Sequence, residues 1–476
     1  MTADLYRLAM AVLQPGYEGT RAPDWLRRAL GEGLGGAVLF ARNSPDARHI
    51  QALRAENPGA VVAIDEEGGA VTRLEAASGS SFPGNRALGV VDDVRLTERV
   101  GRQIGRMLAE ADITLDYAPS ADVNSDPANP VIGIRSFGPA ADLVARHTVA
   151  YIDGVQGAGV AACAKHFPGH GDTTTDSHLA LPAVRASREV LAERDLPPFR
   201  AAVRAGVRAI MCGHLLAPAL DPAVPATLSR TILTELLRGE LGFDGMLVTD
   251  AIEMRAVAAV FSPGEIAVRA LAAGADAVCV SLATERSLRD LRDAIVAAVR
   301  EGALPEERLA EAAARVRAVS GWYGEQAALR DKAIADADPG AGMEAARAAL
   351  TTTGTARLTR PPLVVEVNTR LSQAVDPSMP TGLATALAEV LPGTARVRLA
   401  EEGELPPFDD RPVVLVVHDA ARLAWVRDRI ARAVRTRPDT IVVDTGVPAF
   451  PAGAAHLATH GVSRVSARAA AEWLIR

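Results

Sequence analysis

A polar segment of eighteen residues is the first place in this sequence that could do chemistry. Residues 165–182 read KHFPGHGDTTTDSHLALP and contain His166, His170 and His178, three of the nine histidines in the chain. Because the segment is rich in polar residues and glycine and follows an apolar run, we expect a long loop between a strand and a helix. Metal ligation is one use of a histidine-rich loop, but the spacing here matches no common zinc motif.

Asp176 and His178 form the pair in this loop that is best suited to proton transfer. A spacing of two residues does not place them on one helix face, but it lets a carboxylate reach the neighbouring imidazole in a turn. The carboxylate can then hold one ring nitrogen and orient the other toward a reacting group. On chemistry alone, Asp172 or His170 could play the same part.

The elements that must position these residues are short apolar runs that alternate with longer amphipathic segments. This alternation predicts an α/β fold, a (β/α)8 barrel of the TIM type, with the open doubly wound sheet as the competing arrangement. The eight expected strands are Tyr6–Leu13, Gly36–Phe40, Val61–Asp65, Thr114–Ala118, Val160–His166, Ala209–His214, Met246–Asp250 and Ala277–Ser281. The clearest expected helices are Pro45–Glu56, Val94–Glu110, Ala141–Gly157, Ser187–Ala205, Arg230–Leu241 and Pro263–Ala273.

Four of the expected strands end in a polar residue: Asp65, His166, His214 and Asp250. In a parallel barrel the carboxyl ends of all strands open at one mouth, where such barrels build their active sites. We therefore expect these side chains to converge. A single polar residue at a strand end can also simply mark the place where the strand meets water.

The sequence after Trp322 predicts a second, smaller domain. We expect the barrel to cover residues 1–322, a linking helical region to cover 323–360, and a three-layer α/β domain to cover 361–476. Its expected strands are Leu363–Val367, Val397–Leu399, Val413–Val417 and Thr440–Val443. Its expected helices are Leu383–Leu391, Arg422–Thr436 and Ala467–Ile475.

The composition excludes several classes of protein. A net charge of −7 without a basic stripe predicts no nucleic-acid partner. No apolar run is long enough to span a membrane, and the first residues lack the features of a secretory signal, which predicts a cytoplasmic protein with no membrane partner. The three cysteines, Cys163, Cys212 and Cys279, lie in apolar runs and are expected to be buried and unpaired.

Several motifs together resemble glycoside hydrolase family 3, and most closely its β-N-acetylglucosaminidase branch, the enzymes of muropeptide recycling. The motifs are the loop at 165–182, VLFARN at 38–43, DEEGGAVTRL at 65–74, GIRSFG at 133–138 and VTDAIEM at 248–254. The resemblance implies an exo-acting hydrolase, without a cofactor, that releases terminal β-linked N-acetylglucosamine from muropeptide or chitooligosaccharide-type carbohydrate substrates. One departure is Glu66, where the family often carries Gln.

Two groups in this sequence fit the hydrolysis of a glycosidic bond with retained configuration. Such hydrolysis needs a carboxylate at the anomeric carbon and a proton donor at the leaving oxygen, about 5 to 5.5 Å apart. Asp250 ends the apolar run MLVTD, which would hold a nucleophilic carboxylate rigidly, and the resemblance points to the same residue. Asp250 could instead cap a helix that begins near Ile252. The resemblance implies that Asp176 and His178 serve as acid and base where other glycosidases use a glutamic acid.

Further residues in the matched motifs offer donors and acceptors for sugar hydroxyls. The resemblance implies that they line the subsite for the N-acetylglucosamine ring. They are Asp65, Arg73, Arg135, Lys165 and His166, together with His214, which could equally be a buried structural histidine. Lys165 is also one of only two lysines among the 51 basic residues, which indicates a site that needs a compact ammonium group.

Three alternatives to this hydrolase remain open on the sequence alone. A neutral histidine base repels an incoming anion less than a carboxylate does, so inorganic phosphate could replace water and make the enzyme a phosphorylase. A β-glucosidase or β-xylosidase of the same family would take its acid from a second-domain glutamate, and Glu401, Glu402 and Glu404 lie in an expected loop there. A barrel that has lost turnover could serve as a sugar-binding protein.

Overall fold

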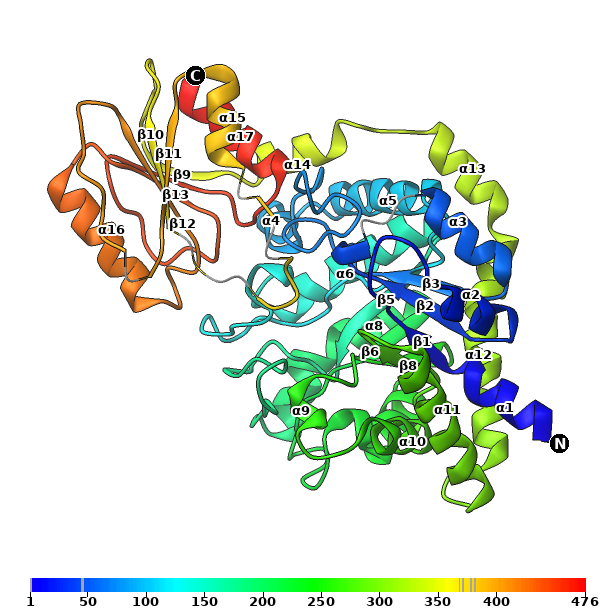
Figure 1. Cartoon of the computed structure of the whole chain (residues 1–476). Coiled ribbons are helices and arrows are strands. Elements are labelled where there is room, and N and C mark those ends of the chain that lie inside the picture. The colour runs from blue at the N-terminus through cyan, green and yellow to red at the C-terminus, as the bar shows by residue number, and fades with distance from the viewer. Residues whose placement is uncertain are drawn as a thin grey trace.

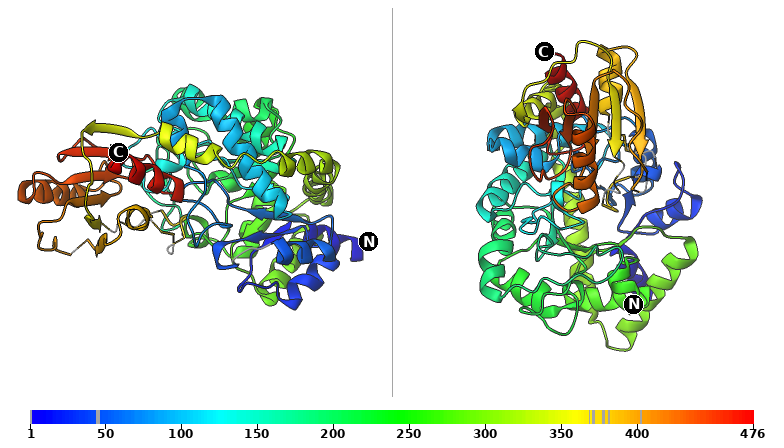
Figure 2. Two further views of the ribbon diagram at one scale, coloured as in Figure 1. Left: turned by 90° about the horizontal axis from the view of Figure 1, so that it is seen from above. Right: turned by 90° about the vertical axis from the view of Figure 1, so that its left-hand side faces the viewer.

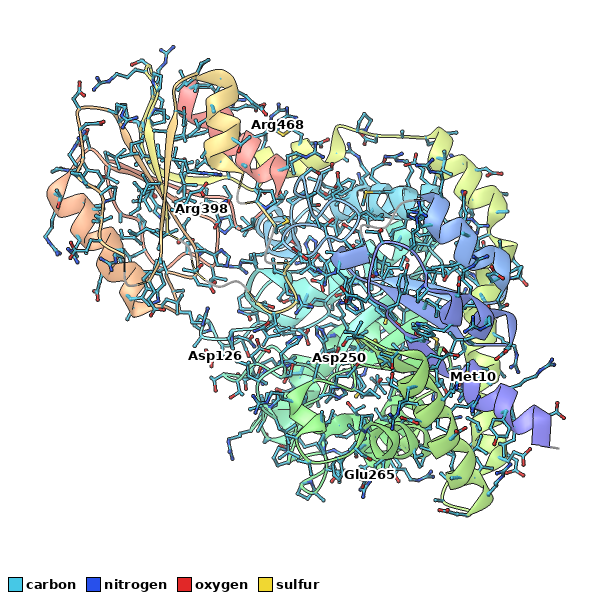
Figure 3. The ribbon with its side chains drawn as sticks, viewed as in Figure 1. Met10, Asp126, Asp250, Glu265, Arg398 and Arg468 are labelled. Carbon is cyan, nitrogen blue, oxygen red and sulfur yellow. The ribbon has the colours of Figure 1, made fainter. Side chains whose placement is uncertain are left out.

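The chain folds into a barrel and a smaller second lobe beside it (Figures 1 and 2). The computed structural model describes residues 2–43, 47–367, 369, 372–376, 379–380, 382–401 and 403–476. Figure 3 shows Asp250 within the barrel and Arg398 in the second lobe. Met10 lies on the side of the barrel that is away from the second lobe.

The barrel is built from eight parallel strands in chain order, which confirms the predicted fold class. The strands are β1 (Leu13–Pro15), β2 (Gly36–Leu39), β3 (Val61–Ile64), β4 (Leu115–Asp116), β5 (Ala161–Phe167), β6 (Ala209–Cys212), β7 (Met246–Thr249) and β8 (Val278–Val280). Strands β2 to β7 pair in succession, and β1 pairs with β8. A parallel bridge between Val248 and Ala277 joins β7 to β8, and the Gly35 N–H donates to the Met10 carbonyl at 3.0 Å where β2 meets β1.

The first predicted strand, Tyr6–Leu13, was wrong. Helix α1 (Thr2–Ala11) occupies most of this run, and β1 begins only at Leu13. Leu5 and Ala9 are both buried, and their spacing of four residues is the helical period, not the period of two that a strand requires.

Helices ring the barrel and cover the outer faces of its strands. Their bounds are α2 (Asp24–Gly31), α3 (Ala47–Glu56), α4 (Asn85–Val91), α5 (Val94–Glu110), α6 (Ala141–Gly157), α7 (Arg188–Val190), α8 (Leu196–Arg204), α9 (Arg255–Ala258), α10 (Pro263–Ala273) and α11 (Glu285–Arg300). The predicted bounds of α5, α6 and α10 are confirmed. In the part of the chain that the structure describes, no helix is long and apolar enough to cross a membrane.

Alternation along the strands separates two apolar cores. On β3, Val61 and Ala63 point into the barrel, whereas Val62 and Ile64 pack against the outer helices. The interior core also takes side chains from α12 (Glu306–Glu325). All three cysteines are buried and free, as predicted.

The second lobe is a three-layer α/β domain, as predicted. Its strands are β9 (Thr351–Gly354), β10 (Leu363–Val367), β11 (Ala395–Leu399), β12 (Val413–Val417), β13 (Ile441–Asp444) and β14 (Ala455–Ala458), in the order β11-β10-β12-β13-β14-β9. Helices α15 (Leu383–Val390) and α17 (Arg464–Ile475) pack on one face of this sheet, and α16 (Ala424–Thr436) packs on the other.

The region between the lobes differs from the single linking helical stretch that was expected. Helix α12 runs through the predicted boundary at residue 322, and α13 (Ala327–Ala335) and α14 (Ala341–Ala348) follow it. Strand β9 then pairs antiparallel with β14 at the edge of the second sheet. The second sheet therefore begins before residue 361. Neither β9 nor β14 was predicted, because their TTTG and AHLA runs are too short to show a period.

The two lobes share a small apolar cluster and an ion pair. Residues 70, 71 and 134 of the barrel loops pack with residues 375, 379 and 462 of the second lobe. Beside the cluster, the Arg464 guanidinium lies 2.9 Å from the Glu75 carboxylate. These contacts bring a loop of the second lobe to the barrel mouth.

Candidate active site

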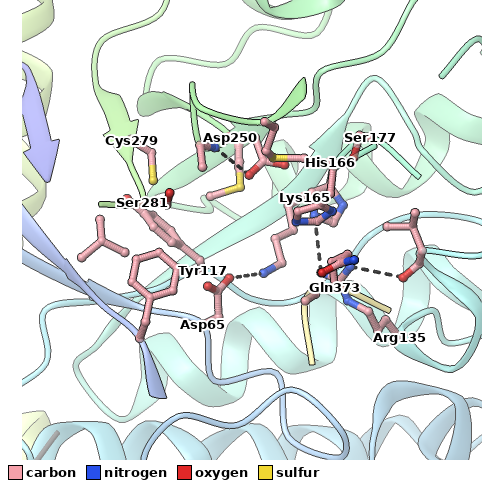
Figure 4. A pocket seen from close by; sticks show the side chains of 18 of the residues that line it. Asp65, Tyr117, Arg135, Lys165, His166, Ser177, Asp250, Cys279, Ser281 and Gln373 are labelled. Atoms are coloured by element: carbon pink, nitrogen blue, oxygen red, sulfur yellow. Dashed lines mark hydrogen bonds and ion pairs between the residues drawn. The ribbon is translucent and has the colours of Figure 1, made fainter. Parts of the chain in front are cut away.

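A cavity of about 280 Å³ opens at the carboxyl ends of the barrel strands (Figure 4). The structure brings seven of the nine predicted site residues together in its lining. These are Asp65, Arg73, Arg135, Lys165, His166, His178 and Asp250. Residues that lie up to 185 positions apart in the chain thus meet at one mouth, because parallel strands end on the same side of a barrel.

Asp250 follows β7 directly and is held by backbone hydrogen bonds. Its own N–H donates to the Cys212 carbonyl at 3.0 Å, and its Oδ1 accepts the Ala251 N–H at 2.8 Å. Burial disfavours the charged carboxylate, but the nearby His214 and His166 imidazoles outweigh this effect and lower the pKa of Asp250. The next helix, α9, begins at Arg255, so Asp250 does not cap it. The carboxylate is therefore ionised and available to the cavity.

Asp176 and His178 form the hydrogen-bonded pair that their spacing predicts. The Asp176 Oδ1 lies 2.8 Å from His178 Nδ1 and also accepts the His178 backbone N–H at 2.9 Å. Burial opposes ionisation of Asp176, but the hydrogen bonds from His178 lower its pKa below the ordinary value. With Nδ1 engaged, Nε2 is the ring nitrogen that His178 can offer to a group in the cavity.

The two alternative proton carriers are less well placed. Asp172 does not line the cavity and instead pairs with Arg194 at 2.9 Å. His170 lines the cavity, but its two ring nitrogens lie 2.7 Å from Thr173 Oγ1 and 3.2 Å from Ser177 Oγ. Burial also lowers the pKa of His170 to about 4, so this ring carries no proton to donate near neutral pH.

Asp65, Lys165 and Arg135 line the cavity and form a buried network of charges with Glu67. Lys165 Nζ lies 2.7 Å from both Asp65 Oδ1 and Glu67 Oε1, and Arg135 Nη2 lies 2.6 Å from Glu67 Oε1. Burial opposes the charges, but these opposite neighbours lower the pKa of Asp65 and Glu67 and raise that of Lys165. All four groups are therefore ionised and fixed in place.

Two further residues of the site, Glu67 and Asp122, were not predicted. Glu67 lies inside the motif DEEGG, two positions after the predicted Asp65, and this proximity was the available signal. Asp122 is fully buried, and its Oδ2 lies 2.7 Å from His166 Nδ1. It follows β4 by a few residues, so the strand-end argument used for Asp65 could have found it. Because Asp122 holds Nδ1, the Nε2 of His166 is turned toward Arg135, at 3.4 Å from its Nη2.

The second lobe contributes to the cavity. Gln373 and Ala374, from the loop after β10, belong to its lining. Arg73 Nη2 donates to the Ala374 carbonyl at 2.8 Å and lies 3.6 Å from Asp65 Oδ2, so this guanidinium joins the lobes at the site. Glu401 and Glu404 do not line the cavity, and Glu402 lies outside the described residues.

His214 does not contact the cavity, in contrast to its predicted role in sugar binding. It is fully buried, and its ring nitrogens lie 2.8 Å from Thr227 Oγ1 and 3.0 Å from the Ala251 carbonyl. Both nitrogens are thus used within the protein. The structure supports the other interpretation, a buried histidine that supports the backbone next to Asp250.

The arrangement as a whole suits a polyhydroxylated ligand. The His178 imidazole and the Asp250 carboxylate line the same small space as a network of fixed donors and acceptors. Among the described residues, no group of three or more His, Cys, Asp or Glu side chains is arranged to hold a metal ion.

Comparisons with known proteins agree with this geometry. The N-terminal domain of glycosyl hydrolase family 3 matches residues 31–319. A solved β-N-acetylglucosaminidase of this family from Paenibacillus sp. str. FPU-7 is 33% identical, with a TM-score of 0.87 over 99% of this chain and 96% of that one. The β-hexosaminidase of Chromobacterium violaceum is 34% identical over 60% of this chain and 81% of its own length.

This chain matches only part of the length of one longer relative. The β-hexosaminidase A of Pseudoalteromonas piscicida is 35% identical over 60% of this chain, and the match spans about half, 52%, of that protein. The family match nevertheless includes the seven strands β2 to β8 and the motifs at their carboxyl ends, and only β1 of the barrel lies before it. The chain therefore belongs to glycosyl hydrolase family 3.

Proposed function

We propose that this protein is an exo-acting, retaining β-N-acetylglucosaminidase. The observation that carries the proposal is that Asp250 and the Asp176-bound His178 face one cavity of about 280 Å³, which suits a single terminal sugar ring. The names of the similar enzymes, β-hexosaminidase and β-N-acetylglucosaminidase, support this choice of substrate.

The reaction proceeds in two displacements. First, Asp250 attacks the anomeric carbon, and the bond to the leaving oxygen breaks as His178 Nε2 gives that oxygen its proton. The neutral imidazole then takes a proton from water, whose oxygen attacks the anomeric carbon and releases Asp250. Two inversions leave the β configuration unchanged. Asp176 stays ionised throughout, holds Nδ1 and stabilises the imidazolium.

The buried network binds the sugar hydroxyls in this proposal. Asp65 supplies the acceptor, and Arg135, Lys165 and His166 supply donors. Because the network is already ionised and paired without substrate, no side chain needs to be reorganised when the ring enters.

Water is the acceptor in this proposal. The phosphorylase alternative is tested by running the reaction with inorganic phosphate and analysing the sugar product; release of a sugar 1-phosphate would make the enzyme a phosphorylase. The β-glucosidase alternative is disfavoured because Glu401 and Glu404 do not line the cavity. Comparing aryl glucoside, xyloside and N-acetylglucosaminide substrates tests it directly.

The proposed function is tested by turnover and stereochemistry. The wild type should hydrolyse an aryl β-N-acetylglucosaminide, and proton NMR should show the β anomer first. Asp250→Ala and His178→Ala should each lose most turnover, by about 10²-fold or more, while melting at the wild-type temperature. Near-normal rates in either variant would remove that residue from the mechanism. A muropeptide and a chitooligosaccharide compared side by side would identify the natural class, and cell fractionation would test the expected cytoplasmic location.

A further inference from the structure

We propose that Gln373, a residue of the second lobe, binds the sugar in the barrel cavity and helps to select it. This inference rests on the proposed function and extends it beyond the barrel. Every motif that resembles the family lies before residue 255, so no sequence signal pointed to position 373.

Gln373 reaches the cavity from a loop that follows β10. Gln373 and its neighbour Ala374 line the same cavity as Asp250 and His178. The flanking Ser372 and Val375 border a second, smaller hollow together with residues 131–135. Figure 4 shows Gln373 on the side of the cavity where Arg135 lies, away from Asp250. A ring attacked by Asp250 would therefore present a different part of its edge to Gln373.

Residues 372–375 of this loop are held in place by contacts with the barrel and with one another. Arg73 donates to the Ala374 carbonyl at 2.8 Å, and Val375 packs in the apolar cluster between the lobes. Within the loop, the Ala374 N–H donates to Ser372 Oγ at 3.1 Å. Gln373 is thus positioned by its neighbours on both sides, which is what a binding residue requires.

The hydrogen-bonding capacity of the Gln373 side chain is unused. Among the residues that the structure describes, neither its amide oxygen nor its amide nitrogen has a protein partner, whereas Asp65, Lys165 and Arg135 are paired with each other or with Glu67. A primary amide offers two donors and one acceptor, which matches a sugar hydroxyl or an acetamido group. It also adds no charge to a network whose charges are already balanced.

A contact of this kind should affect binding more than chemistry. It lies away from the reacting groups, so it stabilises the bound substrate and the transition state about equally. Removing it should raise KM about tenfold and leave kcat within about twofold of the wild-type value.

The test uses two variants of the full-length protein with a matched control. Gln373→Ala removes the side chain, and Gln373→Leu keeps its approximate volume but removes the amide. Both should raise KM for an aryl β-N-acetylglucosaminide about tenfold and weaken binding of free N-acetylglucosamine, measured by calorimetry, by a similar factor. Gln51→Ala, at an exposed glutamine on α3, should change neither quantity.

The outcomes separate this inference from the proposed function. Unchanged KM and affinity in both variants would overturn the role of Gln373, and so would a loss in Gln373→Ala that Gln373→Leu restores, because packing alone would then explain it. If the wild type hydrolyses no N-acetylglucosaminide, the proposed function fails. Calorimetry with N-acetylglucosamine, glucose and xylose then decides the role of Gln373 independently: weaker binding of any of these sugars in both variants supports it, and no change overturns it.

Discussion

The backbone N–H of Ala256 donates to the carbonyl oxygen of Ser177 at 3.2 Å. This bond ties the loop that carries His178 to the segment that follows Asp250, although 79 residues separate Ser177 from Ala256. The relative position of the two proposed reacting groups is therefore set by a contact between their own loops.

Asp176→Asn should lower activity less than His178→Ala does. The asparagine can still orient Nδ1, but it lacks the charge that stabilises an imidazolium. We expect kcat to fall about 10- to 100-fold and the alkaline limb of the pH–rate profile to move to lower pH. Asp142→Asn, at an exposed aspartate on α6, is the control and should leave the profile unchanged. A lower kcat with an unmoved alkaline limb would contradict the electrostatic role of Asp176.

Glu66→Gln should stabilise the protein at alkaline pH. Glu66 is fully buried, its Oε2 accepts the backbone N–H groups of Arg73 and Leu74, and its Oε1 has no partner among the described residues. Burial raises the pKa of Glu66 from 4.5 to about 7, and the buried Asp116 carboxyl lies beside it. The neutral acid thus has nearly the shape and hydrogen-bonding capacity of a glutamine.

The sign of this pH effect follows from the proton balance. Between pH 4.5 and 7 the unfolded chain releases the Glu66 proton while the folded chain keeps it, so the free energy of unfolding decreases as the pH rises. The loss amounts to at most about 3 kcal/mol and is complete above pH 7. In thermal melts, the gain in Tm of Glu66→Gln over the wild type should be larger at pH 8 than at pH 5. An equal difference at both values would show that Glu66 does not titrate in this window.

Glu67→Gln should destabilise the fold by about 3 to 5 kcal/mol. Among the described residues, the change leaves the buried Arg135 guanidinium without its carboxylate and leaves Lys165 with only Asp65 as an oppositely charged partner. Chemical denaturation measures this loss. The control is Glu56→Gln, which breaks the exposed pair with Arg27 and should cost less than about 1 kcal/mol. A cost below 1 kcal/mol at both positions would mean that the buried network contributes little to stability.

Gly171→Ala should disturb the loop that carries the proposed proton donor. A methyl group at this position would lie 1.8 Å from the Val123 carbonyl oxygen, so the backbone must shift. We expect a destabilisation of about 1 to 3 kcal/mol and a clear loss of turnover. Gly31→Ala at the end of α2, where nothing lies within 4 Å, should be neutral or slightly stabilising. Similar melting temperatures and rates for both variants would rule out close packing as the reason for glycine at position 171.

Local patterns in the sequence predicted most of the barrel and much of the site. Apolar runs placed seven of the eight strands, and polar residues at their ends identified Asp65, His166 and Asp250 as neighbours. These predictions succeed because strand period and parallel topology place such residues at one mouth. The spacing of Asp176 and His178 also predicted their hydrogen bond, since two residues in one turn meet through local geometry.

Only the tertiary structure decided which polar residues face the cavity and which are buried. His214 and His166 both follow apolar runs, yet the first is enclosed by Thr227 and Ala251, and the second lines the cavity. The contribution of Gln373 was likewise beyond reach of the sequence, because it depends on how the second lobe packs on the barrel through residues distant in the chain. Strand ends and short spacings are local properties and can be read from the sequence, whereas burial and contact between lobes depend on all the packed elements together.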